Sequence, residues 1–127
     1  MQARLESIRQ DLRKRAIDAV DDGIVAGANA MKNNIATRPT TWMAENRGKT
    51  GRIDSGNMLD AVSYELREEG DVIVGEWGWI TQEAKYFLTQ ENGGPNTFTG
   101  GEIEPMNAMR DSVLPAHEAM LRKFGSR

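Results

Sequence analysis

The sequence predicts a single α+β domain in which a long N-terminal helix and a C-terminal helix pack on one face of an antiparallel sheet of about three or four strands. Three observations predict it. Apolar residues recur at helical spacing near both ends of the chain, the alternation typical of strands lies between them, and strands do not alternate with helices as they do in a parallel sheet. A chain of 127 residues (1–127) is long enough for one core but not for two.

The first helix is predicted over residues 5–35. Its length of about 45 Å exceeds the diameter of so small a domain. Gly23 and Gly27 each cost about 1 kcal/mol relative to alanine inside a helix, so a bend or break there is an alternative to the single element that we prefer. The apolar positions recur every three or four residues and are Leu5, Ile8, Leu12, Ala16, Val20, Ile24, Ala28, Met31 and Ile35.

Residues 37–54 are predicted to form a long loop, because they show neither a helical nor a strand period. Compact domains seldom keep such a loop unless it is functional or disordered, and a solvated floppy loop is an equally good interpretation. Trp42 and Met43 give the loop an apolar surface that could dock on a neighbour. Its bases outnumber its two acids and are Arg38, Arg47, Lys49 and Arg52.

A β-hairpin is predicted over residues 61–79. Apolar residues at 62, 64 and 66 alternate with polar ones, and a second apolar run at 72–74 follows the turn sequence Glu69-Gly70-Asp71. The glycines beside Trp77 and Trp79 indicate a bulge or a close approach by another backbone.

Two further elements complete the chain. Residues 83–92 could form a short helix or a third strand, and periodicity does not decide between them. The last helix is predicted over residues 105–124, with Pro105 in its first turn and a kink at Pro115, which lacks a backbone donor.

The residue types argue against an enzyme and against a cofactor. Cysteine is absent and His117 is the only histidine, which excludes thiolate chemistry and leaves no usual zinc site. His117 lies in a methionine-rich helix and is interpreted as a surface or packing residue in preference to a catalytic base. The acidic clusters at 21–22 and 68–71 lack calcium-loop spacing. We therefore assign no catalytic, cofactor-binding or metal-binding residue.

Net charge and hydropathy limit the partners. The formal net charge is −3, so no long-range field attracts nucleic acid to the isolated chain. No apolar run is long enough for a membrane span or a signal peptide, which predicts a soluble protein without a membrane partner.

Three segments carry a resemblance to a known family. Residues 55–62, Ser-Gly-Asn-Met-Leu-Asp-Ala-Val, resemble a Thr-Gly-x-Leu-x-x-Ser-Ile turn that leads into a strand. Residues 86–93, Tyr-Phe-Leu-Thr-Gln-Glu-Asn-Gly, are similar to a Tyr-x-x-x-Val-Glu-x-Gly segment, with Gln90 at the apolar position. Residues 105–109 resemble a Pro-Phe-Leu-x-Pro-Ala segment that opens the last helix, although the second proline comes late, at Pro115. In this order the chain resembles the neck and tail-completion proteins of long-tailed bacteriophages, also described as head-tail connector or minor tail components.

The resemblance implies a virion structural protein that assembles in the host cytoplasm and performs no bond chemistry. Copies would form a ring, with six expected, that joins the head connector to the tail tube, and DNA would pass through its lumen without sequence-specific binding. Adjoining neck, connector or tail-tube proteins would be its other partners; terminator, connector and completion roles all remain open. The loop would order on assembly. The candidate assembly interface consists of Arg38, Trp42, Met43, Arg47, Lys49, Arg52, Trp77 and Trp79.

Two other functions compete with this one. A small nucleic-acid-binding or regulatory module could use the basic loop at 37–54 together with Trp77 and Trp79, which would point to one side of a strand and could stack on bases. Core packing or a subunit contact is a better interpretation of the two tryptophans, because no basic residues lie between them. A hydrolase with dispersed carboxylates has the least support.

Overall fold

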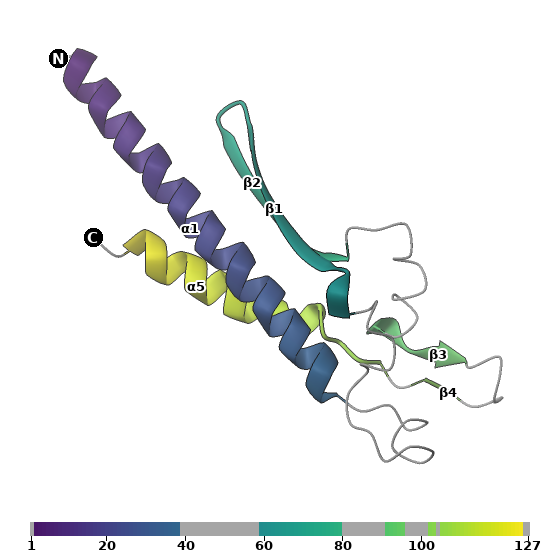
Figure 1. Cartoon of the computed structure of the whole chain (residues 1–127). Helices are drawn as coiled ribbons and strands as arrows, with labels where there is room; N and C mark the ends of the chain where they lie inside the picture. The colour runs from purple at the N-terminus through teal and green to yellow at the C-terminus, as the bar shows by residue number, and fades with distance from the viewer. Residues whose placement is uncertain (1, 39–58, 80–90, 96–101, 104, 126–127) are drawn as a thin grey trace.

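The computed structural model describes residues 2–38, 59–79, 91–95, 102–103 and 105–125. Five of the candidate interface residues, Trp42, Met43, Arg47, Lys49 and Arg52, lie outside the described residues, as do most of the predicted loop and residues 83–90. The α+β class is confirmed, and Figure 1 shows the arrangement. In chain order the elements are α1 (Gln2–Thr37), β1 (Val62–Glu69), β2 (Val72–Trp79), β3 (Gly94–Pro95), β4 (Glu102–Ile103), η1 (Arg110–Ser112) and α5 (Val113–Gly125).

The strands of the described residues form two separate two-stranded sheets, where the sequence predicted one sheet of three or four strands. β1 pairs antiparallel with β2, from Val62 opposite Trp79 to Glu69 opposite Val72. In the described part of the chain β3 pairs with β4 and with no other strand, and each of the two has two residues. Pro95 has no backbone N–H to donate to a further strand, which fits a short pair outside the main sheet.

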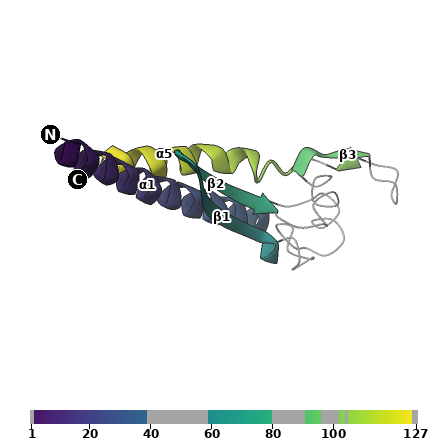
Figure 2. The ribbon, with the colours of Figure 1, turned by 90° about the horizontal axis from the view of Figure 1, so that it is seen from above.

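One face of the β1–β2 hairpin packs on the helices. Strand geometry puts alternate residues on one face, and this face includes Val62 and Leu66 of β1 with Gly75, Trp77 and Trp79 of β2. α1 crosses that face, and α5 runs antiparallel to α1, with its C-terminal end toward the N-terminus of α1 (Figure 2). The predicted packing of both helices on one sheet face is therefore present.

α1 is one unbroken helix of 36 residues, about 54 Å long. Neither glycine breaks it. A Cβ on Gly27 would lie 2.5 Å from Cε2 of Trp77, and one on Gly23 would lie 3.1 Å from the Ala116 carbonyl oxygen. The two glycines thus let the hairpin and α5 approach the helix axis.

The core lies along the C-terminal half of α1, whereas no described residue of α1 before Ala19 is buried. Side chains from both strands and from the segment before α5 close over this half of the helix. The buried cluster consists of Ala28, Met31, Ile35, Val62, Trp79, Met106 and Ala108.

The last helix begins later than the predicted residue 105. Residues 105–109 are irregular, and Asn107 has a left-handed φ of 54°. Helical structure starts with η1 at Arg110 and becomes α-helical at Val113. Pro115 consequently lies in the first turn of α5, where a missing N–H costs little, and not inside a longer helix that it would kink.

Candidate assembly interface

The two tryptophans of the predicted interface belong to the chain's own core. Trp79 is 7% exposed and lies in the buried cluster. Trp77 is half-buried against Gly27, and its indole Nε1 donates a hydrogen bond of 2.8 Å to Oγ of Ser112. Ser112 in turn donates to the Met109 carbonyl at 2.6 Å. These rings hold β2 to α1 and η1.

Arg38 also faces its own chain. Its Nη1 donates to the carbonyl oxygens of Met106 and Asn107 at 2.7 and 3.1 Å, and to Oδ2 of Asp111 at 2.6 Å. Hydrogen bonds from Arg38 first, and then from Arg110, lower the pKa of the Asp111 carboxyl below its ordinary value. Arg38 therefore ties the end of α1 to the segment that precedes α5.

Glu91 is a structurally important residue to which the sequence analysis gave no role. Its carboxylate is buried and accepts hydrogen bonds from the backbone N–H groups of Met109, at 3.0 and 3.1 Å, and Arg110, at 3.0 Å. The Glu91 carbonyl also accepts the N–H of Asn107 at 3.1 Å. A carboxylate at a helix N-terminus satisfies donors that the helix itself leaves free. The one signal for it was the Glu-x-Gly of the family resemblance.

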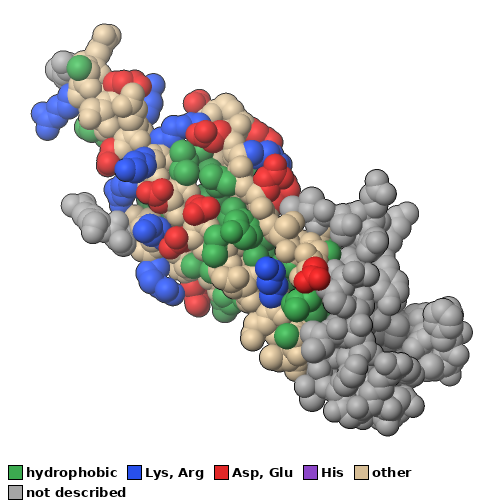
Figure 3. All heavy atoms as spheres, viewed as in Figure 1, with side chains coloured by type: hydrophobic (Ala, Val, Ile, Leu, Met, Phe, Trp, Pro, Cys, Tyr) green, Lys and Arg blue, Asp and Glu red, His purple; other side chains and the backbone are tan. Residues whose placement is uncertain are grey.

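An apolar groove lies between α1, β2 and α5, with a cavity volume of about 280 Å³. Two of its walls meet closely, because a Cβ on Gly75 would lie 2.5 Å from Cγ2 of Ile24. Figure 3 shows hydrophobic side chains gathered over the middle of α1, beside the hairpin. The groove is lined by Val20, Gly23, Ile24, Ile73, Gly75, Trp77, Val113, Ala116, His117 and Met120.

The N-terminal part of α1 extends past the elements that cover the rest of the helix (Figure 1). Arg13 Nη2 reaches the hairpin tip, with bonds of 2.9 Å to Glu68 and 3.1 Å to the Gly70 carbonyl. Arg15 Nη2 donates at 2.7 Å to the carbonyl of Phe124, near the end of α5. We call residues 2–14 the arm.

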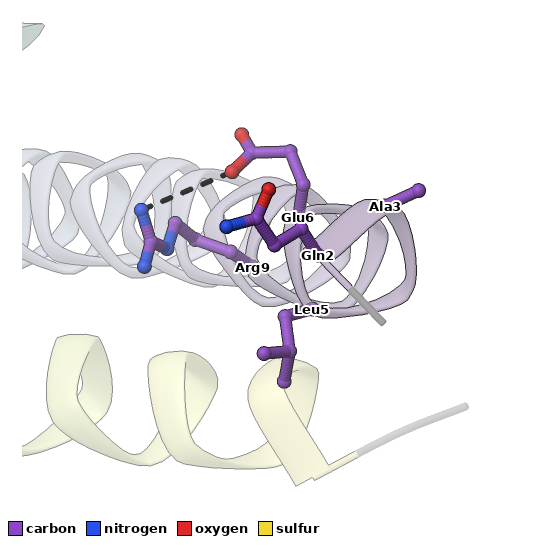
Figure 4. A pocket seen from close by; sticks show the side chains of 5 residues that line it. All are labelled: Gln2, Ala3, Leu5, Glu6 and Arg9. Carbon is purple, nitrogen blue, oxygen red and sulfur yellow. Dashed lines mark ion pairs between the residues drawn. The ribbon is translucent and has the colours of Figure 1, made fainter.

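The arm carries an apolar row on an otherwise mostly polar and charged surface. Leu5, Ile8 and Leu12 are 60%, 48% and 47% exposed. Figure 4 shows that Leu5 and Glu6 point to opposite sides of the helix, and that Glu6 pairs with Arg9 at 3.9 Å. The shallow hollow drawn there is lined by residues of this one helix, so it is part of the arm's surface and not an enclosed site.

The described residues contain no other arrangement that points to chemistry. Among them, no group of three or more histidine, aspartate or glutamate residues could hold a metal ion. Their buried polar side chains are Glu91 and Ser112, and both are engaged in fixing the start of the last helix. No helix in the described part of the chain has the length and hydrophobicity needed to cross a membrane.

Comparison with known proteins adds no relative. No protein-family model matches the chain, and no curated protein or solved structure matches it significantly. The functional inference therefore depends on the sequence resemblance, the groove and the arm.

Proposed function

We propose that this protein is a structural subunit of a bacteriophage neck or tail-completion ring that joins the head connector to the tail tube around the DNA path. The observation that carries the proposal is the arm, which extends beyond the protein's own core and exposes Leu5, Ile8 and Leu12. An isolated helical segment of this length is marginally stable in water, so a partner that covers it stabilises it.

The position of Glu91 adds support. Glu91 and Gly93 are the residues that match the Glu-x-Gly part of the family segment, and Glu91 fixes the start of the last helix in this fold. Gly93 has a φ of 74°, a conformation that favours glycine. Because the fold gives a structural reason for both Glu91 and Gly93, the match of this segment supports the family resemblance from which the proposal comes.

The proposed partners are further copies of this chain, with six expected, and the adjoining neck, connector or tail-tube proteins of the same virion. DNA passes through the lumen of the ring without sequence-specific contacts. Terminator, connector and completion roles are three versions of the same proposal, and they differ in which neighbouring ring the subunit contacts.

The alternative nucleic-acid-binding module gains no support from the described residues. Base stacking requires exposed aromatic faces, whereas Trp79 is buried and Trp77 packs against Gly27. The hairpin that carries them, residues 62–79, has five acids and one base, a net charge of −4. Such a surface repels phosphates.

The decisive experiment is reconstitution with the head-connector, neck and tail-tube proteins that the proposal names as partners. We expect light scattering after gel filtration, and electron microscopy of stained particles, to show copies of the chain bound as a ring at the end of tail tubes or on the head connector. The Leu114→Ser variant, changed at an exposed residue outside the groove, should bind as the parent does. A chain that binds none of these proteins, whether or not it self-associates, would rule out the proposal.

A further inference from the structure

We propose that the arm of one copy lies in the apolar groove of a second copy, with Leu5, Ile8 and Leu12 facing the groove. The inference rests on the proposed function, since it names the two surfaces through which copies of a ring subunit meet. The described chain supplies both surfaces separately, and no other described residue of the same copy covers either of them.

The apolar row of the arm lies on the same face of α1 that α5 covers further along the helix. Leu5, Leu12 and Ala19 follow one another at intervals of seven residues, which keeps them near one face of a helix. Ala19 is buried, and Gly23, one turn later on this face, lies against Ala116 and Met120 of α5. Coverage by α5 stops near Arg15, where Arg15 bonds to Phe124, and among the described residues the same face is exposed at Leu12 and Leu5.

The arm cannot fill the groove of its own chain. Val20, Gly23 and Ile24 form one wall of the groove, and they belong to the same unbroken helix as the arm. A straight helix cannot fold its first turns back onto its own middle. An arm that occupies this groove must therefore come from another molecule.

The two surfaces match in length. Leu5 and Leu12 are seven residues apart, and so are Val113 and Met120, the ends of the groove wall on α5. At the rise of an α-helix each separation is about 10 Å. An amphipathic helix placed in an apolar groove in this way is a common mode of recognition between proteins.

Charge favours the same contact. The arm, residues 2–14, has four bases and two acids, a net charge of +2, and the hairpin beside the groove has a net charge of −4. Within one copy a single arm base, Arg13, pairs with the hairpin, through Glu68. In the described chain the remaining arm bases Arg4, Arg9 and Lys14 have no ion-pair partner from another element. Seating an arm beside a second copy's hairpin brings them near acids.

The contact is head-to-tail, because the arm and the groove are different surfaces. Each copy then has one free groove and one free arm, and repeated contacts close a ring when the rotation between copies divides a full turn. A symmetric pairing of two arms would instead end at a dimer. The geometry of the contact thus discriminates between the two assemblies.

The test uses engineered cysteines in the full chain, which has none of its own. Ile8→Cys places a thiol on the arm and Val113→Cys places one on the groove wall, both at exposed positions. The two preparations are mixed at high concentration and crosslinked with a short thiol-specific reagent, and mass spectrometry identifies the joined peptides. Mixtures of Asp22→Cys with Val113→Cys provide the background, because Asp22 is exposed on α1 outside both surfaces.

We expect several-fold more arm-to-groove product in the Ile8 mixture than in the background mixture. When Leu5→Ser and Leu12→Ser are added to the Ile8→Cys chain, the yield of arm-to-groove product should fall to the background level. Leu114→Ser should leave the yield unchanged, because Leu114 is a leucine of matched exposure outside the two surfaces (63% against 60% for Leu5). Arm-to-arm product from the Ile8→Cys chain alone, or no excess over background, would overturn the inference.

The outcome can be separated from that of the proposed function. Ring incorporation into tails without an arm-to-groove product refutes the contact and leaves the phage assignment standing. An arm-to-groove product from a chain that binds no neighbouring structural protein supports the contact and refutes the assignment.

Discussion

Gly27 of α1 and the indole of Trp77 on β2 are in such close contact that a Cβ on the glycine would lie 2.5 Å from Cε2 of the ring. This contact sets the distance between the helix and the hairpin, and the hairpin in turn forms one wall of the groove. A glycine that looks unfavourable in a helix is thus required by packing.

Gly27→Ala is expected to lower the free energy of unfolding by about 1–3 kcal/mol, the usual cost of overpacking a core. Alanine favours a helix over glycine by about 1 kcal/mol, so a stabilised variant would contradict the packing argument. Chemical denaturation followed by tryptophan fluorescence measures the change. Gly125→Ala, where no heavy atom lies within 4 Å of the new Cβ, is the matched control and should change stability by about 0.5 kcal/mol at most.

The helices and the hairpin could be predicted because each follows from a local period. Ile24, Ala28, Met31 and Ile35 recur at helical spacing and all are buried. Leu5 follows the same period, yet it is exposed. The spacing of apolar residues identifies which face of a helix is apolar. How much of that face is covered depends on the length of the elements that pack on it, which is a property of the tertiary structure.

The start of the last helix and the groove could not be predicted from the sequence. Pro105 is well suited to a first turn, but Glu91, which is 18 residues before Met109, sets the start through its carboxylate. The groove combines side chains from three elements that are far apart in the sequence. Neither feature has a period or a motif that a single sequence displays.

The hydrogen bond between Trp77 and Ser112 should contribute about 1 kcal/mol to stability. Trp77→Phe and Ser112→Ala each remove it but also change packing, so the double variant is needed to isolate the bond. We expect the double variant to be more stable, by about that amount, than the sum of the two single changes predicts. Urea denaturation of the four proteins tests this, and strictly additive effects would show that the two side chains are not coupled.

Glu91→Gln should destabilise the fold by about 1–3 kcal/mol, because an amide cannot accept from all the backbone donors that the buried carboxylate satisfies. The effect should be greatest at the start of the last helix. Hydrogen exchange of the Met109 and Arg110 amides should accelerate more than that of the amides in β1. Glu118→Gln, an exposed change on α5, is the control; equal effects of the two variants would remove Glu91 from this role.

The Asp111 carboxyl should make stability depend on pH in the acidic range. Hydrogen bonds from Arg38, and secondarily from Arg110, lower its pKa in the folded state. A carboxyl whose pKa is lower in the folded state than in the unfolded state stabilises the fold. This stabilisation is fully present at pH values above the unfolded-state pKa of about 3.9, and it is lost as the pH falls through the folded-state pKa. Arg38→Gln should therefore flatten the fall in the urea midpoint below about pH 4, in addition to any loss at neutral pH.

The Glu76 carboxyl provides the comparison for this experiment. A hydrogen bond from Arg67 lowers its pKa too, so it contributes to the same decline with the same sign. Glu76→Gln should remove its own share and leave the share of Asp111 intact, since Arg38 and Arg67 belong to separate ion pairs. If both variants show the same dependence of the urea midpoint on pH as the parent, neither ion pair is formed in solution. If the dependence is flattened in Arg38→Gln alone, the acid sensitivity arises at the junction between α1 and the last helix.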